Sequence, residues 1–315
     1  MLLVQKFLHL LATNGRMVLI AGLVVGMLWL DLAIFLKPYI PEFAFGLLFL
    51  ASFRVGPKAA IGAVKDMRLA IVMVLVLQIL VPVGLFLVFK LVGWNTMLAY
   101  TIVLLMGGAA LSATPHLTVM VGHEPAPALR QLVLGTALLP LTIFPVIWLM
   151  PQFGDFQSIL MPSIKLFLVI GTSALLAFAL RHFRFSNLDE SAMQNVFKTV
   201  DGMSSIILFL IVIGLMSAVA PALYNDTRAF YITLLAAFAV NFGLQILFYV
   251  LLQSPKLSGV RVATSIAAGN RNMALFLTAL PASVTDPMLL FIGCYQIPMY
   301  LTPVLLKKLY MRTKS

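Results

Sequence analysis

Long apolar segments dominate this chain of 315 residues, and they restrict it to a membrane. Apolar residues make up 62% of the sequence and charged residues 10%, whereas a soluble domain has about 45–50% and about 25%. The mean hydropathy is +1.07. A helix needs roughly 20 apolar residues to cross the hydrocarbon core. The sequence therefore predicts an all-α polytopic protein, with the lipid bilayer as its partner.

Ten apolar segments are predicted to cross the membrane. Their expected boundaries are 17–35, 39–53, 69–92, 97–121, 126–149, 159–180, 203–223, 230–252, 262–280 and 288–306. A basic, partly apolar stretch containing Lys58, Lys65 and Arg68 follows the second segment and is expected in the membrane interface. One longer polar stretch, 181–198, separates the first five segments from a further set of five.

Lys and Arg residues gather in alternate connections. If the N-terminus is inside, most of the 21 Lys and Arg residues fall on the cytoplasmic side, as is usual for membrane proteins. We therefore expect a multi-pass protein with both termini cytoplasmic. The same bias explains the net charge of +11 without a nucleic-acid partner.

No pattern of an enzyme, cofactor site or metal site is visible in the sequence. The single cysteine, Cys294, excludes an intrachain disulfide and a thiolate cluster. No His/Cys/Asp/Glu group has metal-ligand spacing, and no catalytic triad or phosphate-binding glycine loop is present. We expect neither catalysis nor a bound cofactor.

Five segments followed by five predict two inverted repeats, as in many secondary transporters. The first repeat would cover about 1–150 and the second 159–315, within a single transmembrane unit over 1–315. The fourth and ninth segments are the most polar and helix-breaking, at 107–116 and 264–272. Because substrates bind near the midplane where such helices are broken, we expect the site there.

Arg271 is the strongest candidate for a substrate-binding residue. A guanidinium near the bilayer centre costs at least about 2.5–3.5 kcal/mol, so it should face a partner or a water-filled cavity. It would either bind an anion or hold the carbonyls of a broken helix. Gly269 is expected to break the ninth helix, and the flanking Asn270 and Asn272 would contact substrate or shape the break.

Pro115 is expected to break the fourth helix in the same way. The helix that begins there would direct its free N–H groups toward the midplane. We expect a buried His116 that bonds substrate or titrates, or else joins two helices. Ser112 and Thr114 would contact substrate or satisfy backbone groups freed by the proline.

Buried amides mark the third and eighth segments, which are repeat mates. Gln78 lies four residues before Pro82, and Asn241 and Gln245 share one helical face. Gln78 and Asn241 are candidates for substrate contact, and the alternative for each is a hydrogen bond between helices.

The chain resembles the bile acid:sodium symporter family. Three segments carry the resemblance: Lys37-Pro-Tyr-Ile-Pro41 with the Gly56-Pro57-Lys58 turn, the Pro115-broken helix with its Gly122-His-Glu124 link, and Gly269-Asn-Arg-Asn272. The resemblance implies a bacterial inner-membrane protein with ten helices and crossing helices four and nine. It also implies a panel domain (spans 1, 2, 6, 7), a core domain (spans 3–5, 8–10) and alternating access between them.

The resemblance fails at the ion ligands. Sodium-coupled relatives have an acidic residue where this chain has Ala267, a glutamine at Arg271 and a Ser-Asn pair at Thr114-Pro115. A guanidinium would repel sodium, because two unit charges 4 Å apart cost about 4 kcal/mol at an effective dielectric of 20. We expect coupling to protons, or none, rather than to sodium.

These features favour a secondary transporter of a small organic anion. One alternative keeps the family's activity, the sodium-coupled uptake of bile acid-like amphipathic carboxylates. An alternative of another class is a membrane sensor that binds its ligand without moving it.

Overall fold

A computed structural model describes residues 2–62, 67–150 and 156–312, and over these residues the regular elements are helices. The expected interfacial position of Lys65 lies outside the described residues. In chain order the elements are α1 (Leu2–Thr13), α2 (Gly15–Leu28), α3 (Leu30–Leu36), η1 (Lys37–Tyr39), α4 (Ile40–Gly62), α5 (Met67–Leu75), η2 (Val76–Leu80), α6 (Val81–Leu91), α7 (Met97–Met106), α8 (Thr114–Met120), α9 (Ala126–Trp148), α10 (Phe156–Phe185), α11 (Glu190–Asn225), α12 (Thr227–Leu251), η4 (Pro255–Leu257), α13 (Ser258–Gly269), α14 (Ala274–Ala279), α15 (Ala282–Thr285), η5 (Asp286–Met288), α16 (Leu289–Leu305) and α17 (Lys307–Met311).

The described residues contain seven helical segments long and apolar enough to cross a membrane. They are Leu30–Pro57, Arg68–Leu91, Ala126–Trp148, Leu160–Phe185, Glu190–Asn225, Thr227–Leu251 and Ala282–Leu305. An eighth is possible if Leu3–Thr13 and Met17–Leu28, which meet at 90°, form one broken span. The chain is therefore a multi-pass integral membrane protein.

The fourth and ninth expected segments are each divided into short helices. Residues 97–121 form α7, with 10 residues, and α8, with 7 residues. Residues 262–280 lie in α13, with 12 residues, and α14, with 6 residues. Neither segment has a continuous helix of spanning length, and the interruptions fall where glycine, asparagine and proline were expected to break the helix.

The expected boundary between the first two spans is wrong. We placed it near Pro38, but the helix is interrupted at Trp29, where φ is −121° and ψ is 77°. Asp31 lies in the first turn of the following helix, where a negative charge is favourable. The 3₁₀ turn Lys37–Tyr39 then accommodates Pro38, because proline fits the first positions of a helical turn.

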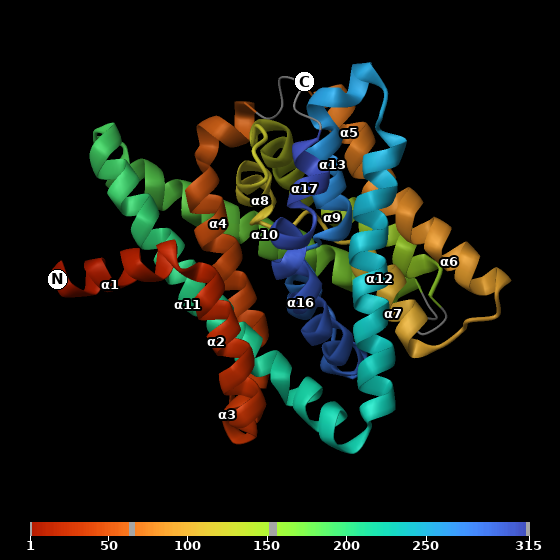
Figure 1. Ribbon diagram of the computed structural model, residues 1–315. Coiled ribbons are helices and arrows are strands. Elements are labelled where there is room, and N and C mark those ends of the chain that lie inside the picture. Colours follow the sequence, from red (N-terminus) through yellow and green to blue (C-terminus); the bar gives the residue numbers. More distant parts are fainter. Residues whose placement is uncertain (1, 63–66, 151–155, 313–315) are drawn as a thin grey trace.

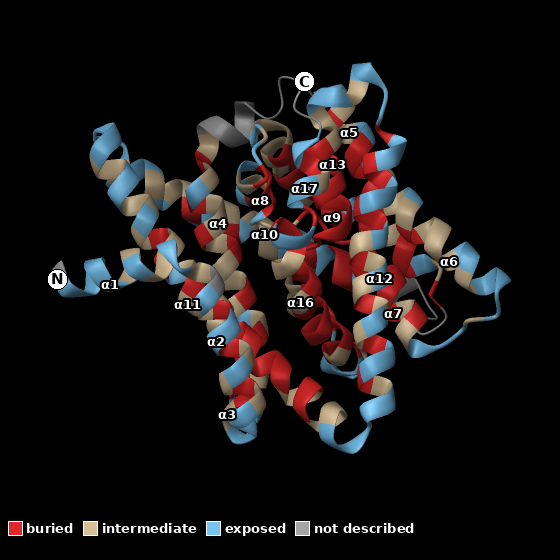
Figure 2. Ribbon diagram, in the orientation of Figure 1, coloured by how far each residue is buried: buried red, intermediate tan, exposed pale blue. Residues whose placement is uncertain are grey.

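The helices pack in two groups (Figure 1). In one group α4 packs on α10 and α11, and α2 packs on α11. In the other, α12 packs on α13 and α16, and α9 packs on α5, α8 and α13. The two groups are also in contact with each other: α10 packs on α9, α14 packs on α4 and α10, and α16 packs on α11. Buried residues concentrate where the helices meet, whereas α1, α3 and α6 carry many exposed residues (Figure 2).

Close packing at Gly269 gives a test of this arrangement. A Cβ atom at Gly269 would meet the Asn241 carbonyl oxygen and would lie 2.6 Å from Gln245 Cγ. We expect Gly269→Ala to lower the free energy of unfolding in detergent by about 1–3 kcal/mol, as overpacking does. Gly259→Ala, on the same helix with no atom within 4 Å of its Cβ position, should have little effect. Equal stability of the two variants would contradict the close approach of α12 and α13.

Candidate functional site

The two helix breaks meet and exchange backbone hydrogen bonds. The amide of Leu111 donates to the Asn270 carbonyl oxygen at 2.9 Å, and the amide of Asn272 donates to the Ala109 carbonyl oxygen at 2.8 Å. Ala110 and Arg271, which lie between these two bonds, form an isolated antiparallel β-bridge. Non-helical backbone at membrane depth is tolerated where protein buries it. The bridge satisfies part of that requirement and fixes the two broken helices to each other.

Arg271 lies at this crossing and is 1% exposed, so its expected burial is confirmed. Its guanidinium donates to three backbone carbonyl oxygens: Ala268 at 3.2 Å, Gly108 at 3.2 Å and Leu77 at 3.0 Å. Ala268 is near the end of α13, and Gly108 lies just past α7. Carbonyls at helix C-termini have no intrahelical partner and carry partial negative charge. The cation therefore compensates dipoles from two broken helices.

The third carbonyl comes from a π-helical turn. Leu77 lies in η2, between α5 and α6, and Pro82 follows at the second residue of α6. Hydrogen bonds in the π-turn span five residues, as from the Val81 amide to the Val76 carbonyl oxygen, so Pro82, which has no N–H, leaves the Leu77 carbonyl without a helical donor. Single π-turns often occur at functional sites. Here the turn lies where the chain supplies an oxygen to Arg271.

The charge of Arg271 has no carboxylate within ion-pair distance in the described ranges 2–62, 67–150 and 156–312. The ion pairs found there are Lys37–Asp286 and Arg54–Asp201. A guanidinium has five N–H groups, and the three bonds to carbonyls engage only part of them. The contacts match those expected if Arg271 holds broken-helix carbonyls. They also leave a net positive charge at the crossing.

Asn241 and Asn270 are fully buried and bond within the protein. Asn241 Nδ2 donates to the Gly269 carbonyl oxygen at 2.6 Å, and Asn270 Nδ2 donates to Ile266 O at 2.8 Å. Tyr295 OH also donates to Gly269 O, at 2.6 Å. The end of α13 thus receives two side-chain donors at one carbonyl.

The amide network continues from Asn241 along α12. Gln245 Nε2 donates to Asn241 Oδ1 at 2.6 Å and to Thr302 Oγ1 at 3.0 Å. Gln245 Oε1 accepts from Tyr310 OH at 2.9 Å. Sequence reasoning singled out the two amides but missed Thr302, Tyr295 and Tyr310. Their positions in and after the last span gave no signal, because tyrosine and threonine are ordinary residues there.

Gln78 plays a similar part in the first half of the chain. It is 1% exposed, and its Nε2 donates to the Gly135 carbonyl oxygen at 2.9 Å. Its Oε1 accepts from Thr142 Oγ1 at 2.6 Å. Both partners lie on α9. Gln78 therefore joins the third and fifth expected spans, as the helix–helix alternative required.

Two buried oxygens near the break have no hydrogen-bond partner among the described residues: Thr114 Oγ1 and Gln131 Oε1. Their helices, α8 and α9, pack against each other. Gln131, which sequence reasoning missed, also donates through Nε2 to Thr264 Oγ1 on α13. Ser112 is partly exposed and Asn272 is 7% exposed.

The expectation that His116 is buried is wrong. His116 is exposed, because the opposite face of α8 packs against α9 and α13. Thr114, Leu117 and Thr118 form that buried face, with the helical spacing of three and four residues. Helix α8 is also only 7 residues long, so few peptide groups contribute to the helix dipole expected at Pro115.

Comparison with family models and with curated proteins gave no match. No family model matches the chain, and a search of curated proteins found none similar to it. The resemblance drawn from its sequence motifs therefore enters below as a proposal, which depends on the residues and their contacts.

The role of Arg271 can be tested by two substitutions. We expect Arg271→Met to lower the free energy of unfolding by at least about 3 kcal/mol, because three buried carbonyls each lose a donor worth about 1–3 kcal/mol. Arg271→Lys should recover only part of this loss, since a compact ammonium lacks the planar fork. Denaturant unfolding in detergent measures both.

Arg228→Met is the matched control, because Arg228 is exposed and exposed substitutions usually change stability by less than about 0.5 kcal/mol. If Arg271→Met were as stable as Arg228→Met, the assigned contacts at the crossing would be wrong.

Proposed function

We propose that the protein is a secondary transporter of a small organic anion, working by alternating access. The observation that carries the proposal is the crossing of two broken helices around a buried guanidinium. Broken helices near the midplane are the usual binding element of such transporters. A permanent positive charge without a carboxylate partner in the described residues favours an anionic substrate.

The proposed architecture has ten spans in two inverted repeats. The seven long helices, the bent pair near the N-terminus and the two broken segments together supply them. The panel domain (spans 1, 2, 6, 7) would contain α1, α2, α3, α4, α10 and α11. The core domain (spans 3–5, 8–10) would contain α5–α9 and α12–α16. The packing of α4 on α10 and α11, and of α12 on α13 and α16, supports this division (Figure 1).

Sodium coupling is not part of the proposal. Ala267 offers no side-chain oxygen and is fully buried, and Pro115 cannot act as an amide ligand. The guanidinium of Arg271 lies among backbone carbonyls that a cation would otherwise coordinate. We infer that Arg271 replaces the bound ion, so that transport is proton-coupled, exchange-type or facilitative.

The substrate would bind beside the crossing, at the polar groups that are accessible. Ser112, His116 and Asn272 have no side-chain hydrogen bond among those found in the described residues, and all three retain some exposure. The buried Arg271 adds positive electrostatic potential at the crossing. Gln78, Asn241 and Asn270 then hold the crossing through their hydrogen bonds, while the exposed face of α8 meets the substrate.

One ion pair connects the proposed panel and core domains. Lys37 Nζ lies 2.9 Å from Asp286 Oδ2; Lys37 belongs to η1 and Asp286 to η5. Helix α14 also packs on α4 and α10. Lys37 and Asp286 lie near the N-terminal ends of the segments Leu30–Pro57 and Ala282–Leu305, which would be on the outer side if the N-terminus is cytoplasmic. We propose that it closes the outer face in the conformation described.

Uptake by proteoliposomes tests the proposed function. We expect one class among bile acids, short keto acids and oxyanions to accumulate or exchange equally in sodium and choline buffers. Protein-free vesicles and Arg271→Lys vesicles are the controls, and Arg271→Lys should reduce uptake at least about tenfold, as losses of precise geometry do.

Two outcomes would overturn the proposal in different ways. Uptake that disappears without sodium and survives Arg271→Lys would indicate the sodium-coupled symporter of bile acid-like carboxylates. A ligand that raises the unfolding temperature but is never transported would indicate a sensor; at 100 times its dissociation constant such a ligand adds about 2.7 kcal/mol.

The outer closure can be tested by cross-linking in a Cys294→Ser background. We expect a cross-linker joining Lys37→Cys to Asp286→Cys to stop transport, with recovery on reduction, because the two domains could no longer separate there. His9→Cys with Thr199→Cys is the matched control: His9 Nε2 and Thr199 Oγ1 are 3.3 Å apart, and both lie in the proposed panel domain. Full transport by the cross-linked Lys37–Asp286 variant would exclude a moving boundary at this position.

A further inference from the structure

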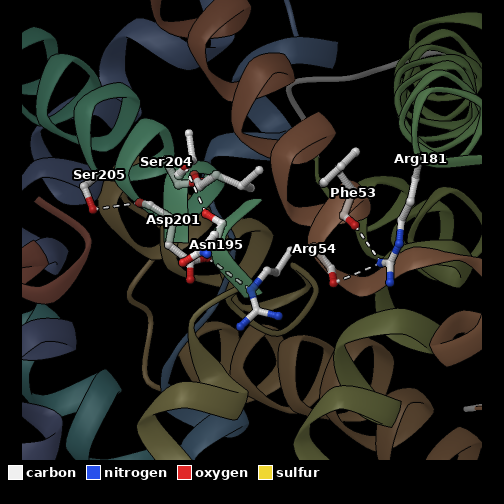
Figure 3. A network of polar contacts seen from close by, with 9 residues as sticks. Phe53, Arg54, Arg181, Asn195, Asp201, Ser204 and Ser205 are labelled. Atoms are coloured by element: carbon white, nitrogen blue, oxygen red, sulfur yellow. Dashed lines mark hydrogen bonds and ion pairs between the residues drawn. The ribbon is translucent and has the colours of Figure 1, made fainter. Parts of the chain in front are cut away.

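A basic cluster lies where α4 packs against α10 (Figure 3). Arg54 is on α4 and Arg181 is on α10. The Cζ atom of Arg54 lies 4.3 Å from the centre of the Phe197 ring, and that of Arg181 lies 5.1 Å from the same centre. Two guanidinium groups from different spans are therefore held near one aromatic ring of α11.

Only one carboxylate is bonded to this cluster in the part of the chain that the structure describes. Arg54 Nε donates to Asp201 Oδ1 at 3.2 Å. Arg181 Nη1 donates to the carbonyl oxygens of Phe53 at 2.9 Å and Arg54 at 3.3 Å. These bonds use Nε of one arginine and Nη1 of the other. The Nη groups of Arg54 and Nη2 of Arg181 have no hydrogen bond among those found in the described residues.

The local backbone is built to hold Arg181 in this position. Gly56 interrupts α4 with φ 73° and ψ 164°, a conformation that favours glycine. A Cβ atom at Gly56 would collide with the Arg181 guanidinium. The arginine thus covers the carbonyls where the regular helix ends, and its remaining N–H groups stay available.

An exposed apolar stripe on α10 leads to the end of the helix that carries Arg181. Leu176, Leu180 and Phe183 are 56%, 43% and 83% exposed, and their spacing places them on one helical face. Arg184 follows on this face, four residues after Leu180, and is exposed. Within a bilayer such a face contacts acyl chains, whereas its basic end lies at the headgroup level.

We propose that Arg54, Arg181 and Arg184 bind the phosphate of an anionic phospholipid whose acyl chain lies along Leu176, Leu180 and Phe183. Guanidinium groups pair strongly with phosphate oxygens, and basic pockets between spans bind anionic headgroups. The excess of positive over negative charge supplies the complementarity. The apolar stripe selects a lipid over a free phosphate. This site is separate from the crossing and does not depend on the proposed transport function.

Native mass spectrometry of the delipidated full-length protein tests the site. Mixed detergent micelles would contain phosphatidylglycerol or phosphatidylcholine with identical acyl chains, and inorganic phosphate would be the soluble probe. We expect a preference for phosphatidylglycerol that falls about 30-fold in Arg54→Gln/Arg184→Gln, because each charge near the surface is worth about fivefold in binding. Arg181 is left in place because it covers the α4 carbonyls.

Two matched variants distinguish an effect of the charges on lipid binding from an effect on folding. Arg54→Lys/Arg184→Lys keeps the charges and should retain most of the preference, and Arg228→Gln, an exposed arginine on α12, should keep all of it. If the glutamine double variant does not fold, the salt dependence of wild-type binding replaces it, with weaker phosphatidylglycerol binding expected at high salt.

Three results would overturn the lipid site. The first is equal binding of the two lipids by the wild type, and the second is an unchanged preference in the glutamine double variant. The third is binding of inorganic phosphate as strong as that of phosphatidylglycerol. The last would assign the cluster to a soluble anion.

Discussion

The burial of the Arg271 charge is the constraint on which the rest of the structure depends. Breaking two helices inside a membrane protein leaves carbonyl oxygens without partners, and an isolated guanidinium there is equally costly. Here each group satisfies the other, because three carbonyl oxygens accept hydrogen bonds from the Arg271 guanidinium. Removal of either component would leave the other unsatisfied. The proposed replacement of a coupling ion by a fixed charge follows from this geometry.

The surrounding amides stabilise the crossing in both halves of the chain. Gln78 bonds α9 from the third expected span, and Asn241 bonds the end of α13 from the eighth. Each is a repeat mate of the other in the proposed topology. Their hydrogen bonds join the third expected span to α9 and the eighth expected span to the end of α13.

Several features of the site could be predicted from the sequence because their chemistry is local. A charged residue in an apolar segment must be buried with partners, and Arg271 is. Glycine, asparagine and proline indicated the interruptions of the fourth and ninth segments. The two faces of α8 could not be predicted, since only the packing of α9 and α13 decides that Thr114 is buried and His116 is exposed.

Long-range partners were also beyond sequence reasoning. Tyr295 and Thr302 belong to a span whose composition is ordinary, and Lys37 and Asp286 are 249 residues apart in the sequence. The helix boundary at Trp29 was missed for a related reason. A proline often coincides with the end of a helix, but here a 3₁₀ turn accommodates Pro38 and the helix continues.

The central claim, that the Arg271 guanidinium occupies the place of a cation, is tested most directly by the sodium dependence of thermal stability. Wild-type protein and Arg271→Ala would be unfolded in detergent, each in sodium chloride and in choline chloride at equal ionic strength. The account predicts no sodium effect on the wild type, and a higher unfolding temperature in sodium for Arg271→Ala, whose three carbonyls become available as ligands. A wild type stabilised by sodium, with Arg271→Ala unresponsive, would contradict it.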